Sequence, residues 1–174
     1  MGTSDIAVRA AHRGDLSRIG DIYAHYVDHS VATFEVERPG REEWNRRYGA
    51  VVEAGLPFLS AVLDGEIVGY AYCAPWKTRP AYLHTVEDSV YVAPDAVGRG
   101  VGGMLLDALL TSCARAGIRE VIAVIVDTDA AASAALHRGH GFVDAGRLTA
   151  VGFKHGRWLD TLLLQRSLVR HTST

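Results

Sequence analysis

Apolar residues recur at helical spacing over four stretches of the chain, which predicts four helices. The first follows Asp15, a residue type that caps helix N-termini, and the second spans 41–54 and stops at Gly55. The third runs from a glycine-rich turn near 100 to about Gly117, and the fourth covers 130–137. Each predicted helix keeps an apolar side that needs a partner surface.

Runs of β-branched and aromatic residues predict seven strands, at 6–8, 58–63, 67–73, 85–92, 121–126, 147–153 and 159–164. Asp64 and Gly65 form a strong hairpin signal, and the fully apolar run at 121–126 predicts a central strand. Early and late strands thus form antiparallel hairpins around one strand–helix–strand unit. The predicted fold is α+β, with a mixed, mostly antiparallel central sheet flanked by helices.

The composition predicts one compact domain. The chain has 174 residues, 48% of them hydrophobic, so we expect a single domain over 1–174, with a core of about 5–168 and a flexible tail at 169–174. A formal net charge of −2 argues against a nucleic-acid partner. The chain has neither a leader pattern nor an apolar run of about 20 residues, so no membrane partner is expected and a cytoplasmic location is predicted.

Cysteines and histidines give no sign of a metal site. Cys73 and Cys113 are the only cysteines, and their wide separation in apolar segments fits neither a zinc site nor a disulfide framework. Both are expected to be reduced thiols in the core. The histidines show no ligand spacing with cysteines or carboxylates, so no metal is expected.

The segment 85–110 carries the most informative pattern, because a strand passes through glycines directly into a helix. Gly98, Gly100, Gly102 and Gly103 remove side chains where the helix begins, so its free N–H groups can approach an anion such as a phosphate. Arg99 is the one cation in this loop. Glycines alone serve tight packing equally well.

This segment resembles the coenzyme A pyrophosphate loop of the GCN5-related N-acetyltransferases, whose pattern is Gln or Arg, two residues, Gly, one residue, then Gly or Ala. Val97, Gly100 and Gly102 occupy those positions, so the first one departs from the family. The resemblance implies acetyl-CoA as cosubstrate and no metal. It places the coenzyme against the following residues: Val90, Tyr91, Val92, Gly98, Arg99, Gly100, Val101, Gly102, Gly103 and Ser133.

Four further segments, 75–82, 85–92, 133–142 and 151–160, are similar to the phosphinothricin N-acetyltransferase subfamily, with a likeness over roughly 5–168. This implies the acetyltransferase fold, in which the two middle strands splay apart around the coenzyme. It also implies acetyl transfer to the α-amino group of phosphinothricin or a similar amino acid, such as methionine sulfoximine or methionine sulfone. A homodimer is implied as well.

Two residues are candidates for proton transfer. An ammonium has no lone pair, so a base must remove a proton before the nitrogen attacks a thioester. The resemblance assigns this role to Glu87, whose pKa of about 4.3 would have to rise unless water relays the proton. His137 occupies the position of a family histidine and can exchange protons near neutral pH. A packed or capping role for His137 is the alternative.

Acceptor binding requires a cation for a carboxylate and aromatic walls. Arg79 and Tyr82 lie in the run that the family uses for the acceptor, beside Lys77, which is either a contact or solvated. Phe34 is a candidate wall, with a core role as the alternative, and Glu35 is a candidate partner for the ammonium. Lys154 and Arg157 either meet a ligand charge or are solvated.

Two departures from the family keep other functions open. Val97 lacks the usual Gln or Arg side chain, and Ala130 stands where the family often has an asparagine near the pantetheine. A CoA-binding regulatory module with slow or no catalysis is therefore one alternative. An enzyme acting on a polyamine, an aminoglycoside or a protein N-terminus is another, although Arg79 and the lack of an acidic cluster favour an anionic acceptor.

Overall fold

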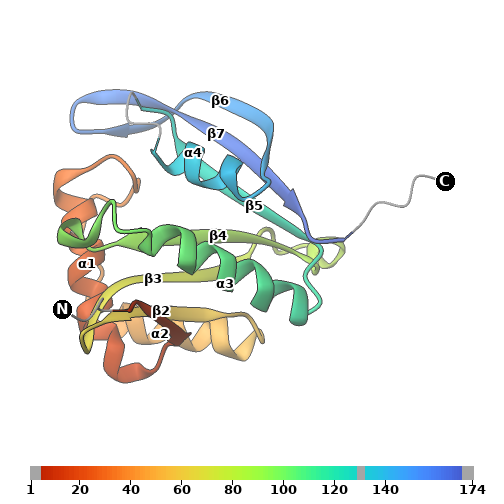
Figure 1. The fold of residues 1–174 in the computed structure, drawn as a ribbon. Helices are drawn as coiled ribbons and strands as arrows, with labels where there is room; N and C mark the ends of the chain where they lie inside the picture. Colours follow the sequence, from red (N-terminus) through yellow and green to blue (C-terminus); the bar gives the residue numbers. More distant parts are fainter. Residues whose placement is uncertain (1–4, 129–131, 170–174) are drawn as a thin grey trace.

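The computed structural model describes residues 5–128 and 132–169, which form one seven-stranded sheet with helices on both faces (Figure 1). The strands are β1 (Ala7–Ala10), β2 (Phe58–Leu63), β3 (Glu66–Pro75), β4 (Thr85–Val92), β5 (Glu120–Val126), β6 (Val143–Lys154) and β7 (Arg157–Ser167). The helices are α1 (Leu16–His29), α2 (Arg41–Glu53), α3 (Val101–Arg115) and α4 (Ala132–Gly139). Of the predicted tail, residues 170–174 lie outside the described part.

The strand order is β1-β2-β3-β4-β5-β7-β6, and only the β4–β5 pair is parallel. The predicted mixed, mostly antiparallel α+β sheet is therefore confirmed, and β5 lies inside it as expected. β6 and β7 are longer than predicted. The residues of β6 before the predicted start at 147 are exposed and include Asp144 and Gly146, so they lack the apolar alternation that marks a strand.

Two helix layers cover the sheet. α1 and α2 cover one face through an aromatic cluster, in which Tyr23 packs edge-on against Trp44 at 5.4 Å and against Tyr91 at 5.1 Å between ring centroids. α3 covers the opposite face and buries Leu105, Leu106 and Leu109 completely, and α4 lies beside α3 and β5. Burial of these apolar side chains is the main stabilising contribution to the fold.

Asp15 precedes α1 as predicted, but its side chain does not cap the helix. Its buried carboxylate instead accepts two hydrogen bonds from Arg9, at 2.7 and 2.9 Å, and one from the Ser60 hydroxyl at 2.9 Å. Asp15 has helical backbone angles (φ −79°, ψ −21°), because it belongs to a short 3-10 turn that runs directly into α1, and its Oδ2 accepts the backbone N–H of His12 at 3.1 Å at the start of that turn. The capping prediction was wrong for this reason.

Cys73 and Cys113 are free, fully buried thiols, as predicted. Their sulfur atoms lie 3.2 Å apart across the β3–α3 interface, although 40 positions separate them in the sequence. The pair belongs to the packed core on the α3 face of the sheet.

Candidate active site

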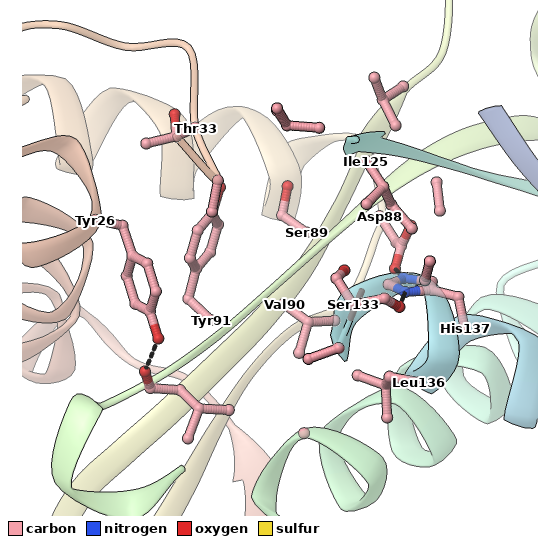
Figure 2. Close-up of a pocket in the computed structure, with 18 of the residues that line it drawn as sticks. Tyr26, Thr33, Asp88, Ser89, Val90, Tyr91, Ile125, Ser133, Leu136 and His137 are labelled. Atoms are coloured by element: carbon pink, nitrogen blue, oxygen red, sulfur yellow. Dashed lines mark hydrogen bonds and ion pairs between the residues drawn. The ribbon is translucent and has the colours of Figure 1, made fainter. Parts of the chain in front are cut away.

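The parallel strands β4 and β5 are joined at one end only. Residues 85–87 pair with 120–122, and beyond them the strands separate (Figure 1). A cavity of about 960 Å³ lies in the opened part. Its walls come from β4, β5, α4, the turn before α3, α1 with the loop that follows it, and the β6–β7 pair (Figure 2). The structure thus contains the splay that the family resemblance implies.

The glycine-rich turn forms one end of this cavity. Gly98 and Gly100 have φ angles of 80° and 82°, which favour glycine, and a Cβ on either would meet nothing within 4 Å. Gly100 directly precedes α3, so the free N–H groups and the positive dipole end of that helix border the cavity. An anionic ligand such as a pyrophosphate fits this end without a charged side chain.

The predicted coenzyme residues converge on the cavity. All of them except Arg99 belong to its lining: Val90, Tyr91, Val92, Gly98, Gly100, Val101, Gly102, Gly103 and Ser133. Val97, the departure from the family pattern, also belongs to the lining, whereas Ala130 lies outside the described residues. Apart from Arg99, the residues predicted for the coenzyme therefore share one cavity.

Glu87 lies in β4 at the last residue that pairs with β5, and its half-buried side chain lines the cavity. Burial raises the pKa of Glu87, the negative charge of Asp88 raises it further, and Lys77 opposes the shift. The direction is the one that a general base for an ammonium requires.

His137 belongs to the cavity lining together with Asp88, which it contacts on the α4 side of β4. Its Nδ1 lies 2.7 Å from the backbone oxygen of Ser133, which can only accept, and its Nε2 lies 2.7 Å from Asp88 Oδ2 (Figure 2). Nδ1 therefore carries a proton, and a second proton must lie between Nε2 and the carboxylate. Burial lowers the pKa of His137, but the hydrogen bond and charge of Asp88 outweigh burial, so the net shift is upward.

Both ring nitrogens of His137 are thus occupied inside the protein. The sequence reasoning missed Asp88, although one signal was available. Strand alternation turns Asp88 to the opposite face from Glu87, toward the helix layer that carries His137.

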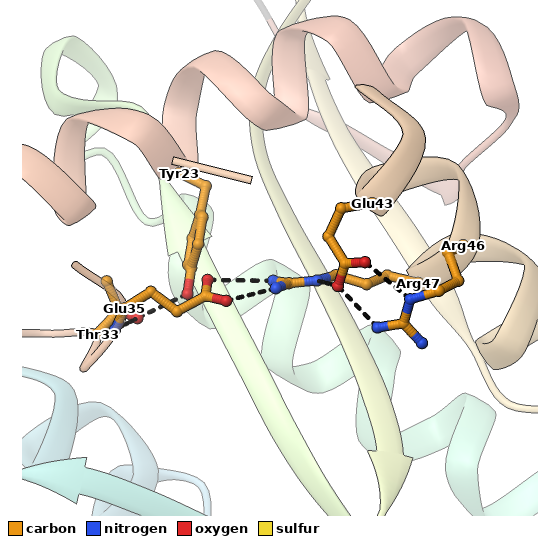
Figure 3. A network of polar contacts seen from close by, with 6 residues as sticks. All are labelled: Tyr23, Thr33, Glu35, Glu43, Arg46 and Arg47. Atoms are coloured by element: carbon orange, nitrogen blue, oxygen red, sulfur yellow. Dashed lines mark hydrogen bonds and ion pairs between the residues drawn. The ribbon is translucent and has the colours of Figure 1, made fainter. Parts of the chain in front are cut away.

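The loop between α1 and α2 forms the opposite end of the cavity. Phe34 belongs to the lining and is 38% exposed, so it is a wall residue and not part of the core. Glu35 is not part of the lining. Its carboxylate forms a two-point ion pair with Arg47, which also donates to Glu43 at 2.7 Å (Figure 3).

This pairing sets the charge state of Glu35. Burial raises the pKa of Glu35, but the hydrogen bonds and charge of Arg47 outweigh burial and lower it overall. Glu35 is therefore an ionised structural partner that holds the loop to α2. A contact with an acceptor ammonium would have to compete with Arg47.

The structure places Lys77, Arg79 and Tyr82 on the exposed segment between β3 and β4, outside the cavity lining. The Lys77 ammonium lies 5.1 Å from the ring centroid of Trp76. Among the described residues, the arginines of the lining are already paired: Arg138 with Asp144, and Arg147 with Asp127 and Asp160. An acceptor carboxylate therefore finds no unpaired arginine or lysine in the described lining.

Comparison with known proteins defines the class. The model of the acetyltransferase (GNAT) family matches residues 20–142. The chain belongs to this family, which confirms the class of enzyme that the sequence predicts. Within the described residues, no helix is long and apolar enough to span a membrane, and no group of three or more potential ligand side chains could hold a metal ion.

Individual relatives narrow the similarity. The chain is 48% identical to a phosphinothricin N-acetyltransferase from Alcaligenes faecalis over 161 residues, which cover 92% of this chain and 82% of the relative. It is 34% identical to an L-methionine sulfoximine/L-methionine sulfone acetyltransferase from Salmonella typhimurium, with 97% and 98% covered. A solved phosphinothricin acetyltransferase from Sinorhizobium meliloti, in complex with AcCoA, superposes with a TM-score of 0.92 at 41% identity, with 97% and 91% covered.

Proposed function

We propose that this protein transfers an acetyl group from acetyl-CoA to the α-amino group of phosphinothricin, methionine sulfoximine or methionine sulfone. The proposal rests mainly on the cavity between β4 and β5. The N-terminus of α3, which can bind an anion through its free N–H groups, borders this cavity, and Glu87 is part of its lining. The names of the relatives supply the acceptor class. Acetyl-CoA supplies a thioester carbonyl as the electrophile.

Different residues along the cavity bind the coenzyme, transfer the proton and contact the acceptor. The backbone N–H groups around Gly100 and Gly102 bind the pyrophosphate, and the β4 edge beyond Glu87, which has no partner strand on that side, borders the pantetheine arm. Glu87 removes a proton from the acceptor ammonium, and Phe34 lines the end of the cavity where the acceptor binds. His137 and Asp88 share a proton at the α4 side of the cavity.

Recognition of the acceptor carboxylate is assigned to Arg79, supported by Tyr82 and Lys77. Since the arginines of the described lining are committed to carboxylates, the cation must come from outside it. Arg79 fits because its guanidinium is exposed and lies eight positions before Glu87 in the same segment. A planar guanidinium binds a carboxylate through two parallel hydrogen bonds.

We also infer a homodimer through the β6–β7 pair. β6 is the last strand of the sheet, and the pair carries five large apolar side chains that are between 46% and 68% exposed: Val143, Leu148, Val151, Phe153 and Trp158. A second copy would cover both this apolar surface and the free strand edge. Sedimentation velocity on the wild type and on Trp158→Ser tests this, because a monomeric wild type contradicts it. A single cytoplasmic domain completes the proposal.

A panel of acceptors with acetyl-CoA, followed by release of free thiol, tests the function. We expect phosphinothricin, methionine sulfoximine and methionine sulfone to be acetylated faster than a polyamine, an aminoglycoside or a peptide with a free N-terminus. Faster acetylation of any of the latter overturns the acceptor class. Tight binding of acetyl-CoA in calorimetry without turnover of any acceptor would favour the regulatory module instead.

A further inference from the structure

β6 is exposed over most of its length and is buried only near its C-terminal end. Of its twelve residues, only Gly152 and Lys154 are buried, and the others are exposed. These two alternate with the exposed Val151 and Phe153, so they lie on the same face of the strand. That face meets the loop between α1 and α2, which is more than a hundred positions earlier in the sequence.

Two contacts join β6 to this loop. The Lys154 ammonium donates a buried hydrogen bond of 2.8 Å to the backbone oxygen of Thr33. Gly152 lies directly against Phe34, since a Cβ on Gly152 would come within 2.4 Å of two ring atoms. Phe34 therefore has β6 on one side and the cavity on the other.

Thr33 is held from the other side as well. Its hydroxyl lies 2.6 Å from the Tyr23 hydroxyl and accepts the backbone N–H of Glu35 at 3.2 Å (Figure 3). Together with the Lys154 bond, these contacts hold the backbone on both sides of Phe34. The position of the Phe34 ring is thus determined mainly by the residue that packs against it, Gly152.

A bulge in β6 aims Gly152 and Lys154 at the loop. Leu148 pairs with Thr161 and Gly152 with Leu159, so residues 149–151 of β6 lie opposite the single residue Asp160 of β7. Ala150 has a φ of 50°, a region that alanine rarely adopts, and its N–H donates to Asp160 Oδ1 at 2.7 Å. Bulges bend a strand and redirect the side chains that follow, which here are those at 152 and 154.

We propose that Gly152 and Lys154 are specificity-determining positions, which set the width of the acceptor end of the cavity by positioning Phe34 and Thr33. Neither residue belongs to the cavity lining, so each acts through the loop. The inference deepens the proposed function, because it rests on Phe34 walling the acceptor. It does not depend on which amine is the acceptor.

Gly152→Ala tests the first position. The added methyl group should push the Phe34 ring toward the cavity and narrow it, so bulky acceptors should lose about tenfold in kcat/KM relative to small ones, the usual effect of one methyl-sized misfit. The KM for acetyl-CoA should not change. Gly146→Ala, on the same strand, is the matched control, because its Cβ would only reach ordinary contact with Leu163 at 3.9 Å.

Phe34→Leu in the Gly152→Ala background should restore the lost acceptors, since the smaller side chain makes room for the methyl group. If Gly152→Ala and Gly146→Ala give the same acceptor order as the wild type, the inference is overturned. A wild type that prefers polyamines or peptides overturns the proposed amino acid acceptor instead, while the two glycine variants must still differ on those acceptors.

Lys154→Met tests the second position by removing the donor at nearly constant length. The Thr33 oxygen then loses its buried partner, which is unfavourable for a buried polar group, and we expect the KM for the acceptor to rise about tenfold with the KM for acetyl-CoA unchanged. Lys154→Arg should restore part of the effect. Arg157→Met, an exposed cation on the same pair of strands, is the control, and an equal rise in both variants contradicts a specific role for Lys154.

Discussion

The two ends of the cavity are built in different ways. The coenzyme end comes from β4, the glycine-rich turn and α3, which follow one another without interruption between 85 and 115. The acceptor end comes from the loop after α1, which is held by α2 and by β6. Its key hydrogen bond, Lys154 to Thr33, joins residues 121 positions apart.

This difference separates what a motif fixes from what the tertiary structure fixes. At the coenzyme end, positive φ angles and a helix start are local properties of glycine-rich sequence, so they are the same wherever the motif occurs. At the acceptor end, the wall depends on ion pairs and packing between distant segments. A change at the first end should therefore affect all acceptors equally, and a change at the second should affect them unequally.

Glu87→Gln should have the largest effect, because Glu87 is the proposed general base and lines the cavity. We expect turnover to fall about a hundredfold or more for every acceptor, since a general base contributes about 10²–10⁴. Wild-type turnover should decline as the pH falls through the raised pKa of Glu87, because only the ionised carboxylate accepts a proton. The variant should lack this acidic limb, and acetyl-CoA affinity from calorimetry should not change.

Retention of both the rate and the pH profile in Glu87→Gln would mean that the amine arrives already deprotonated. A loss confined to one acceptor would contradict a general-base role for Glu87, since it would place Glu87 in acceptor recognition. Asp64→Asn, in the exposed turn between β2 and β3, serves as the control for removing a carboxylate.

Gly102→Val should have the next largest effect and should act on the coenzyme alone. A Cβ on Gly102 would already lie 3.3 Å from Leu136 and 3.7 Å from Val92, so two further methyl groups must intrude into the cavity. Overpacking costs about 1–3 kcal/mol, which predicts about tenfold or more weaker acetyl-CoA binding in calorimetry. Gly49→Val, in α2 and away from the cavity, should bind normally, and unchanged affinity in Gly102→Val would move the anion site elsewhere.

Nearly all residues that the sequence proposes for the coenzyme line the cavity, but only some of those that it proposes for the acceptor do. The motif glycines Gly100 and Gly102, and Gly98 beside them, all line the cavity. Phe34 also lines the cavity, as predicted for the acceptor end. Glu35 does not, because its carboxylate pairs with Arg47 of α2. No local pattern indicates that α2 would bring a guanidinium to this loop.

Other features escaped prediction for the same physical reason. Strand alternation predicts the face of the sheet to which Asp88 points, but only the packing of α4 on that face brings His137 to it. The contact between Cys73 and Cys113 requires β3 to pack on α3. The fold itself was predictable, because periodicity and turn residues are local signals that determine element type and order.

Arg79→Ala should have a smaller effect that differs among acceptors. In the single chain Arg79 is exposed, so its bond to an acceptor carboxylate is screened by solvent and is worth at most about 1 kcal/mol, or about fivefold in acceptor KM. The KM for acetyl-CoA should not change, and Lys77→Ala should have less effect, because an ammonium offers no planar fork. Esterified acceptors should lose affinity for the wild type but not for the variant.

A loss in Arg79→Ala of more than about 2 kcal/mol would indicate a desolvated carboxylate site. A second subunit would then have to cover Arg79, which would make the acceptor end depend on the dimer. Equal losses for the free and esterified acceptors in both proteins would assign the carboxylate to another cation.

Asp88→Asn should have the smallest effect on turnover and should appear mainly in stability. The pKa of His137 is raised in the folded protein, so the pair stabilises it fully below the unfolded value of about 6.5, and this contribution disappears as the pH rises through the folded pKa. Asparagine can donate to a neutral imidazole but cannot stabilise an imidazolium by charge. At pH 6 the Tm should fall by about 2–4 °C, which corresponds to about 1 kcal/mol, and at pH 9 the two proteins should unfold together.

Asp107→Asn is the matched control, since Asp107 is an exposed carboxylate 3.3 Å from His140 on the same helix layer and should change little at either pH. A Tm difference between wild type and Asp88→Asn that stays constant from pH 6 to pH 9 would show that the two residues only pack together. Unequal effects of Asp88→Asn on different acceptors would contradict the separation of the coenzyme end from the acceptor end. They would mean that the Asp88–His137 pair affects the acceptor end, and that the two ends are not independent.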